Sequence, residues 1–314
     1  MSGDVTTSWH RVPARLFGNL PLVGRLLPPA GDDLEGMVVF ITGAARGLGA
    51  EIARQAHRRG AHVALVGRRL GPLRELADEL GSKAAAFEAD VTDLGALRRA
   101  ADDAVAHFGG IDVTVANAGI APPSETIATI DPEDFERTVD VDLLGQWRTV
   151  RATLPALIER RGHVMLVGSV YAFFNGVLAA PYAVSKAGVE QLSRTLRVEL
   201  ADHGVTVGLA YLGFIDTDLA AEVFADDHAS AIRRAIPGFI TRPMTVERAA
   251  ADVLAGIVDR SGRVSAPGWV EPLLAARSIT TAVMDVVLMH NRSVRDAIRA
   301  GEAGTSHRSS PSAQ

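Results

Sequence analysis

Between residues 37 and 268 the chain alternates short apolar runs with longer segments in which apolar residues recur every three or four positions. The short runs predict buried parallel strands, because a strand covered on both faces shows no polar side. Such runs lie at residues 37–42, 61–66, 84–89, 111–116, 163–167, 205–210 and 264–266. The longer segments between them have the period of amphipathic helices.

Two of the predicted helices are long. One follows Asp131-Pro132, a cap followed by a first-turn proline. Its apolar residues fall on one side: Phe135, Val139, Leu143, Trp147, Val150 and Leu154. The other helix lies between the fifth and sixth strands, with Val189, Leu192, Leu196 and Leu200 facing inward.

This alternation predicts an α/β fold with a doubly wound, Rossmann-type parallel sheet of about seven strands flanked by helices. We expect a single domain at 37–268, in which the aperiodic excursion 212–245 forms a lid or binding loop. Outside it we expect an N-terminal extension (1–36), a C-terminal helical extension (269–300) and a disordered tail (301–314).

The N-terminal extension has apolar residues at helix-like spacing with arginines between them, but Pro13 and Pro21 argue against one continuous helix. One interpretation is a surface element that contacts a membrane or a lipid-like substrate. The other, which we prefer, is an arm packed on the domain or on a neighbouring subunit.

Composition narrows the classes of function. The net charge of −5 gives no basic footprint for nucleic acid. The chain has no cysteine, and its nine histidines include no pair at helical metal-site spacing, so we expect no metal. No apolar run approaches the ~20 residues of a membrane-spanning helix. We expect a cytoplasmic protein, with membrane association through residues 1–36 as the alternative.

A glycine-rich turn, Thr42-Gly43-Ala44-Ala45-Arg46-Gly47-Leu48-Gly49, joins the first strand to its helix. Glycines allow a tight turn and let backbone N–H groups approach a pyrophosphate at the helix N-terminus. The second strand ends Val66-Gly67-Arg68-Arg69, without the carboxylate that would bind the ribose of NAD. Arginine in place of that carboxylate favours the 2′-phosphate of NADP, and Arg46 in the glycine turn can approach the same phosphate, so we predict a preference for NADP(H).

Tyr182 and Lys186 are four residues apart and share one helix face. A cation beside a phenol favours the phenolate and lowers the phenol pKa, as acid–base catalysis requires.

Further motifs follow later strands in order: Asp90-Val91, Asn117-Ala118-Gly119, Ser169 and Gly213-Phe214-Ile215-Asp216-Thr217. Together with the TGxxxGxG turn and the YxxxK pair, they resemble the short-chain dehydrogenase/reductase family over residues 37–217. The turn and the resemblance assign cofactor contacts to Gly43, Ala45, Arg46, Gly47, Leu48, Gly49, Arg68, Arg69, Asp90, Val91, Asn117, Ala118, Gly119, Tyr182, Lys186, Gly213, Ile215 and Thr217.

The resemblance also implies catalytic roles. Tyr182 would be the general acid in reduction and the general base in oxidation. Ser169 would orient the substrate oxygen, and Lys186 would hold the nicotinamide ribose and depress the Tyr182 pKa. The helices near 131–158 and 182–203 form subunit contacts in the family, so a homodimer or homotetramer is expected.

Two positions depart from the family pattern. Asp142 replaces the usual Asn, whose carbonyl holds a water leading to the lysine and whose side chain ties its helix to strand four. As a carboxylate, Asp142 would favour charged Lys186, or it would stay protonated if buried. We count it as a catalytic candidate that shifts the pH dependence of activity. Leu212 replaces a proline, which should loosen the following loop.

The expected substrate pocket is mostly apolar, with lining residues Ile120, Val170, Tyr171, Phe173, Phe174 and Phe214 and lid residues near Leu219 and Phe224. These stretches contain no arginine cluster, which favours a lipophilic alcohol or ketone as substrate. The expected function is an NADP(H)-dependent carbonyl reductase or alcohol dehydrogenase. The alternatives are an epimerase or dehydratase on the same fold, and a cofactor-binding protein with decayed catalysis.

Overall fold

The computed structural model describes residues 33–217 and 236–306. Most of the N-terminal extension, the lid residues Leu219 and Phe224, and residues 307–314 lie outside the described part. Among the described residues, no helix is both long and apolar enough to cross a membrane.

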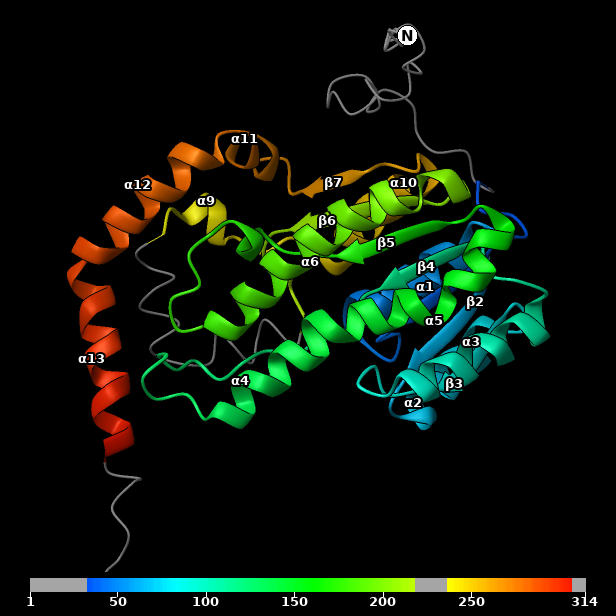
Figure 1. Ribbon diagram of the computed structural model, residues 1–314, viewed down its shortest axis with the longest axis horizontal. Coiled ribbons are helices and arrows are strands. Elements are labelled where there is room, and N and C mark those ends of the chain that lie inside the picture. The colour runs from blue at the N-terminus through cyan, green and yellow to red at the C-terminus, as the bar shows by residue number, and fades with distance from the viewer. Residues whose placement is uncertain (1–32, 218–235, 307–314) are drawn as a thin grey trace, which may run out of the picture. The chain divides into compact units, whose positions relative to one another are not determined.

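A seven-stranded, all-parallel sheet forms the centre of the domain, in the order β3-β2-β1-β4-β5-β6-β7 (Figure 1). Its strands are β1 (Val38–Thr42), β2 (His62–Gly67), β3 (Ala84–Glu88), β4 (Val113–Ala116), β5 (His163–Val167), β6 (Thr206–Leu212) and β7 (Arg263–Ala266). The strand order reverses between β1 and β4, and ligands of such sheets bind outside the carboxyl ends of the strands at that point.

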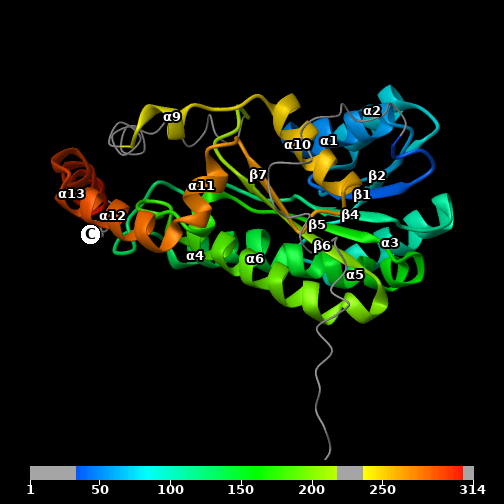
Figure 2. The same ribbon diagram turned by 90° about the horizontal axis from the view of Figure 1, so that it is seen from above.

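Helices cover both faces of the sheet (Figure 2). One face carries α1 (Gly47–Arg58), α2 (Leu70–Leu80) and α10 (Val246–Val258), whose buried side chains share a core with β1 and β2. The other carries α3 (Leu94–Phe108), α5 (Gly145–Arg160) and α6 (Ala180–Glu199) over a second core, and α4 (Pro132–Val139) packs beside α6. The doubly wound Rossmann-type fold expected from the sequence is therefore confirmed.

The long helix after Asp131 differs from its predicted form. A π-helical turn, η3 (Asp140–Leu144), separates α4 from α5. The predicted apolar side is buried only in part: Val150 belongs to the core and Leu143 and Leu154 pack against it, but Trp147 is 42% exposed. Thr149 and Thr153, which the apolar pattern does not mark, are fully buried. These threonines can be buried because each hydroxyl donates to the carbonyl four residues earlier. Apolar periodicity therefore identified the helix and part of its buried side, but not the buried threonines.

The chain after β7 is helical, as the sequence indicates for most of it. The elements are α11 (Val270–Ala275), α12 (Arg277–His290) and α13 (Arg292–Ser306). The predicted tail boundary is wrong, because α13 continues through residues 301–306. Once a helix is formed, each added residue gains a hydrogen bond at little further cost, so a polar composition need not end it. Short elements complete the description: η4 (Val170–Ala172), η5 (Ala201–His203) and α9 (Gly238–Thr241).

Candidate active site

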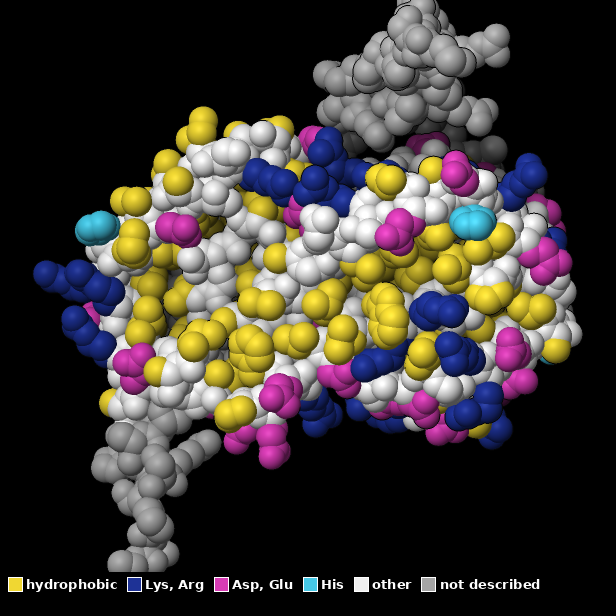
Figure 3. All heavy atoms as spheres, viewed as in Figure 1, with side chains coloured by type: hydrophobic (Ala, Val, Ile, Leu, Met, Phe, Trp, Pro, Cys, Tyr) yellow, Lys and Arg dark blue, Asp and Glu magenta, His cyan; other side chains and the backbone are white. Residues whose placement is uncertain are grey.

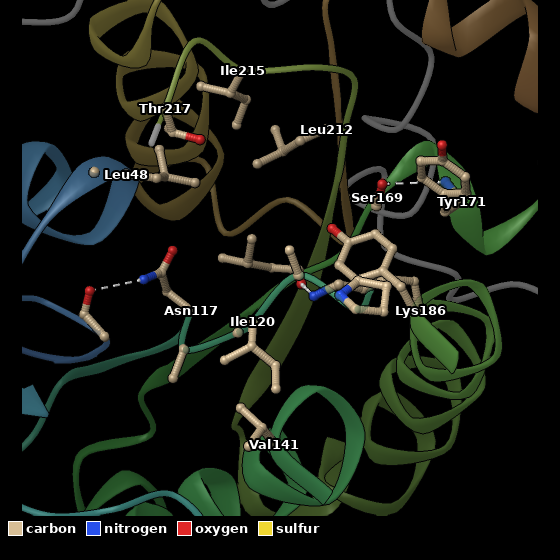
Figure 4. A pocket seen from close by; sticks show the side chains of 18 of the residues that line it. Leu48, Asn117, Ile120, Val141, Ser169, Tyr171, Lys186, Leu212, Ile215 and Thr217 are labelled. Atoms are coloured by element: carbon tan, nitrogen blue, oxygen red, sulfur yellow. Dashed lines mark hydrogen bonds between the residues drawn. The ribbon is translucent and has the colours of Figure 1, made fainter. Parts of the chain in front are cut away.

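A cavity of about 630 Å³ opens at the carboxyl ends of the strands, around the point where the strand order reverses (Figure 4). Seventeen of the eighteen residues assigned to the cofactor from sequence line it, and Gly49 does not. The candidate catalytic residues Ser169, Tyr182 and Lys186 also line it, whereas Asp142 lies behind its wall. A volume of this size is within the usual range for small-molecule sites.

The glycine turn forms one wall of the cavity. Gly43 and Gly47 have φ of +68° and +55°, which side chains disfavour. A Cβ on Gly43 would lie 2.9 Å from the Ala118 Cα atom, so the turn packs directly against the segment after β4. Helix α1 begins here, with neither a side-chain cap nor an acidic residue in its first turn. Its N-terminal N–H groups and positive dipole end therefore fit a phosphate.

Gly49 has a structural role in the same turn. A Cβ there would lie 2.3 Å from the Gly43 carbonyl oxygen and 2.6 Å from the Asn117 amide nitrogen. Asn117 uses that amide to donate to the Thr42 and Gly43 carbonyls at 3.0 and 3.3 Å. The side chain thereby ties the carboxyl ends of β1 and β4 together beside the cavity.

Three exposed arginines, Arg46, Arg68 and Arg69, line the end of the cavity next to the turn. Arg68 Nε lies 3.8 Å from Asp90 Oδ2. The other Asp90 oxygen accepts a hydrogen bond from Thr92 N at 2.9 Å, which fixes the start of the segment after β3. This end of the cavity is thus rich in cationic groups.

Ser169, Tyr182 and Lys186 come together from two elements. Ser169 follows β5, and its Oγ accepts from Tyr171 N at 3.2 Å. Lys186 is buried on α6, donates from Nζ to the Val167 carbonyl at 3.2 Å, and places Nζ 5.2 Å from the centre of the Tyr182 ring. The ring of Tyr171 meets that of Tyr182 edge to face, with centroids 5.6 Å apart. The expected juxtaposition of phenol, ammonium and hydroxyl is present.

The electrostatics of Tyr182 differ from the expectation. Burial, and then the Asp142 carboxylate, raise the Tyr182 pKa above its ordinary value, while the Ser169 hydroxyl lowers it. Burial also lowers the Lys186 pKa, although Asp142 opposes that shift. A lowered phenol pKa was inferred from the cation alone. In the folded protein, desolvation of the phenolate is the larger effect.

Asp142 lies in the π-helical turn and is fully buried. Its Oδ1 accepts from Ile120 N at 2.8 Å, so the side chain ties this helix to the segment after β4. Oδ2 has no hydrogen-bond partner among the described residues. Burial raises the Asp142 pKa to about 6, against the opposing effects of Lys186 and the Ile120 N–H. The carboxyl therefore titrates near neutral pH rather than near its ordinary value.

The segment after β6 is held more firmly than its missing proline suggested. Leu212 is buried and is still part of β6, in register with Ala266. Gly213 N donates to the Ala266 carbonyl at 2.8 Å, and Ile215 forms a β-bridge with Met244. The pairing of Gly213 with β7 and of Ile215 with Met244 thus restrains the start of this segment.

The end of the cavity away from the glycine turn, which we call the substrate end, is lined by only some of the residues that the sequence predicted. Ile120, Val170, Tyr171 and Phe214 line it. Phe173 and Phe174 do not, because they pack behind it: Phe173 against Tyr211, and Phe174 stacked on Trp269 at 6.2 Å between centroids. The sequence reasoning missed other lining residues, namely Ala121, Pro122, Ser124, Val177, Leu178, Ala179 and Ile236. For residues 177–179, the one available signal was their place immediately before the Tyr182 helix.

Comparisons with known proteins agree with this geometry. The family model described as short chain dehydrogenase matches residues 37–228. A 3beta-hydroxysteroid dehydrogenase 1 of Eggerthella lenta is 37% identical over 231 residues, covering 70% of this chain and 87% of the relative. A cis-4-hydroxycyclohexanecarboxylate dehydrogenase of Sinomonas cyclohexanicum is 33% identical over 229 residues, covering 70% and 90%.

A solved structure is similar as well. The crystal structure of a 3-ketoacyl-(acyl-carrier-protein) reductase from Brucella melitensis, complexed with NADH, matches with a TM-score of 0.68 and 26% identity. The match covers 74% of this chain and 97% of that chain. With its sequence motifs, its fold and these relatives in agreement, the chain belongs to the short-chain dehydrogenase/reductase family of oxidoreductases.

Proposed function

We propose that this protein is an NADP(H)-dependent oxidoreductase that interconverts an uncharged, lipophilic ketone and its secondary alcohol. The observation that carries the proposal is the group of Ser169, Tyr182 and Lys186 at the junction of the glycine-turn end and the apolar end of one cavity. A cofactor at the first end and a carbonyl compound at the second would meet beside these three side chains.

The residues of the chain have separate tasks in this mechanism. The nicotinamide, when bound, supplies or accepts the hydride. Tyr182 donates its hydroxyl proton to the substrate oxygen in reduction, and in oxidation its phenolate takes the proton of the alcohol. The Ser169 hydroxyl donates a hydrogen bond to the same oxygen and stabilises its developing negative charge. Lys186, whose Nζ donates to the Val167 carbonyl and lies 5.2 Å from the centre of the Tyr182 ring, would supply a positive charge beside Tyr182 and would hold the nicotinamide ribose of a bound cofactor.

NADP(H) is proposed over NAD(H) because of the charges at the turn end of the cavity. Arg46, Arg68 and Arg69 line it, and the segment that leaves β2 contains no carboxylate. Guanidinium groups suit a ribose phosphate, whereas an acidic residue would bind the free hydroxyl.

An alicyclic substrate is proposed from two independent observations. Apart from the reacting groups Ser169, Tyr182 and Lys186, the described lining residues that we assign to the substrate end have two polar side chains, Ser124 and Tyr171, and no charged one. The names of the two relatives reported above refer to a hydroxysteroid and to a hydroxycyclohexanecarboxylate, so both support a ring alcohol, whereas the carboxylate of the second has no counterpart in this lining. A neutral ring ketone fits this lining without leaving a buried charge unpaired.

Turnover with both cofactors tests the proposal. The purified full-length chain should oxidise NADPH in the presence of cyclic ketones, with a kcat/KM at least about tenfold higher for NADPH than for NADH. Equal or better efficiency with NADH would overturn the cofactor assignment. NADPH binding without turnover of a broad carbonyl panel would favour a decayed site. Isomerised or dehydrated product without net NADPH consumption would favour an epimerase or dehydratase.

We also propose that the chain assembles as a homodimer or homotetramer through α5 and α6. Exposed hydrophobic side chains on these helices and on η3 support the proposal: Leu144, Trp147, Val184 and Val198. Figure 3 shows hydrophobic side chains gathered over the face that α5 and α6 form in Figure 1.

A further inference from the structure

A small third hydrophobic cluster joins the C-terminal helices to the substrate end of the cavity. In it, buried Leu178 packs with Leu288 of α12 and Val294 of α13. Partly buried side chains surround these three: Val177, Ile236, Met284 and Ile298. Val177, Leu178 and Ile236 also line the cavity. The same side chains therefore contact the cavity and the C-terminal helices.

Leu178 is held in an unfavourable backbone conformation. Its φ of +59° lies in the left-handed region, which residues other than glycine seldom adopt. Such conformations persist where the surroundings hold them, and they concentrate at functional sites. Here the surroundings are the side chains of α12 and α13.

Polar contacts fix the same arrangement at two points. Asn175 Nδ2 donates to Asp285 Oδ1 of α12 at 2.9 Å, and Asn175 Oδ1 accepts from Val177 N at 3.0 Å. At the start of α12, Arg277 Nη1 donates to the buried Glu190 Oε1 of α6 at 2.5 Å. Helix α12 is thus attached both to the loop containing Leu178 and to the helix that carries Tyr182.

The loop has little room to move toward α6. A Cβ added to Gly176 would lie 2.3 Å from the Ala183 Cβ atom, next to Tyr182 in the sequence. If a substitution in α12 allows Leu178 to move, Leu178 must therefore move into the cavity or toward α12, and not toward α6.

We propose that α12 and the start of α13 form a supporting wall directly behind Val177, Leu178 and Ile236, which line the substrate end of the cavity. In this proposal Leu288 and Val294 are positioning residues that act through Leu178 to set the size of ring the site accepts. The inference rests on the proposed function, because it concerns the ketone end of that same site. The wall is aliphatic, so it discriminates by shape and not by charge.

The test measures kcat/KM with NADPH for cyclohexanone, decalone and a saturated ketosteroid. In Leu288→Ala, removing the support of Leu178 should raise the ratio of decalone or ketosteroid to cyclohexanone efficiency at least about tenfold. Val294→Ala should shift the ratio in the same direction by less. Ile279→Ala is the matched control, because Ile279 is on the same helix and is 70% exposed; its ratio should equal that of the wild type.

Two further variants separate positioning from general loss of structure. Asp285→Ala removes the acceptor of Asn175 and should shift the same ratio, whereas Asp285→Asn keeps an acceptor oxygen and should restore it. NADPH affinity, measured by fluorescence titration, should stay unchanged in all variants that fold.

The outcomes are distinct. Unchanged ratios in folded Leu288→Ala, Val294→Ala and Asp285→Ala would overturn the wall proposal. Should Leu288→Ala fail to fold, Val294→Ala and Asp285→Ala decide alone. If the wild type reduces none of the three ketones, the proposed function has failed instead. In that case ketosteroid binding measured by calorimetry, compared between wild type and Leu288→Ala, still tests the wall.

Discussion

At the scale of single residues, Tyr182 sits where burial favours its neutral form. Its raised pKa keeps the phenol protonated at neutral pH, as a proton donor in ketone reduction must be, but also makes it a weaker acid than a free phenol. Tyr171 also lines the cavity, and burial raises its pKa to about 12. Two phenols are therefore candidates for the proton donor, and kinetics can distinguish them.

Tyr182→Phe removes the hydroxyl that we assign as acid and base. We expect kcat to fall about 10²–10⁴-fold, the usual contribution of a positioned acid–base group. NADPH binding should persist, because the glycine turn is unchanged. Steady-state kinetics and fluorescence titration check both parts. A larger loss in Tyr171→Phe than in Tyr182→Phe would assign the proton to the other tyrosine.

Asp142→Asn tests the buried carboxyl. With a pKa of about 6 in the folded state and about 4 unfolded, Asp142 binds its proton more tightly when folded. Its contribution to stability is therefore fully present below about pH 4 and is lost as pH rises through about 6. Above that pH its carboxylate favours the charged form of Lys186.

Asn keeps an oxygen acceptor for Ile120 N but does not titrate. We expect an inflection near pH 6 in the kcat/KM profile of the wild type that is missing in Asp142→Asn. Denaturation of the variant should also depend less on pH between about 4 and 6. Superimposable profiles of the two proteins would show that the carboxyl has no influence on catalysis.

At the scale of elements, the turn between β1 and α1 depends on glycine for reasons that differ by position. Gly43 and Gly47 need positive φ, while Gly49 needs the absence of a Cβ. Gly49→Ala should lower the free energy of unfolding by about 1–3 kcal/mol, because the methyl group would collide with the Gly43 carbonyl. It should weaken NADPH binding too, since the turn would have to shift.

Gly71→Ala is the control for that substitution. Gly71 lies in α2, and a Cβ there meets no atom within 4 Å. Alanine should therefore leave stability unchanged or raise it by up to about 1 kcal/mol through helix propensity. Urea denaturation and NADPH titration of both variants are the measurements, and equal behaviour of the two would refute the steric account.

At the scale of the whole molecule, the exposed hydrophobic side chains of α5 and α6 predict subunit contacts. Trp147→Glu places a charge at a 42% exposed position on α5. If α5 is buried between subunits, the unpaired carboxylate should shift the protein toward monomer in size-exclusion chromatography with light scattering. Arg74→Glu, at an exposed position of α2 on the other face of the sheet, should leave the mass unchanged. A wild-type monomer would contradict the prediction.

The sequence alone determined the features that depend on neighbours along the chain. The alternation of apolar runs and helical periods gave the doubly wound sheet, because each element buries its own apolar side. The glycine turn and the Tyr182–Lys186 pair could also be recognised, since each is a short motif within one continuous segment of the chain. Their order along the chain was enough to indicate the family.

Only the tertiary structure decided what depends on segments far apart in the chain. Burial of Tyr182 and Asp142 sets their pKa shifts, and burial is produced by packing that no local pattern records. Tertiary packing also places Phe173 and Phe174 behind the cavity, and it holds Leu178 against the side chains of α12 and α13. The sequence therefore named the reacting groups, whereas tertiary packing determined their protonation and the shape of the space in front of them.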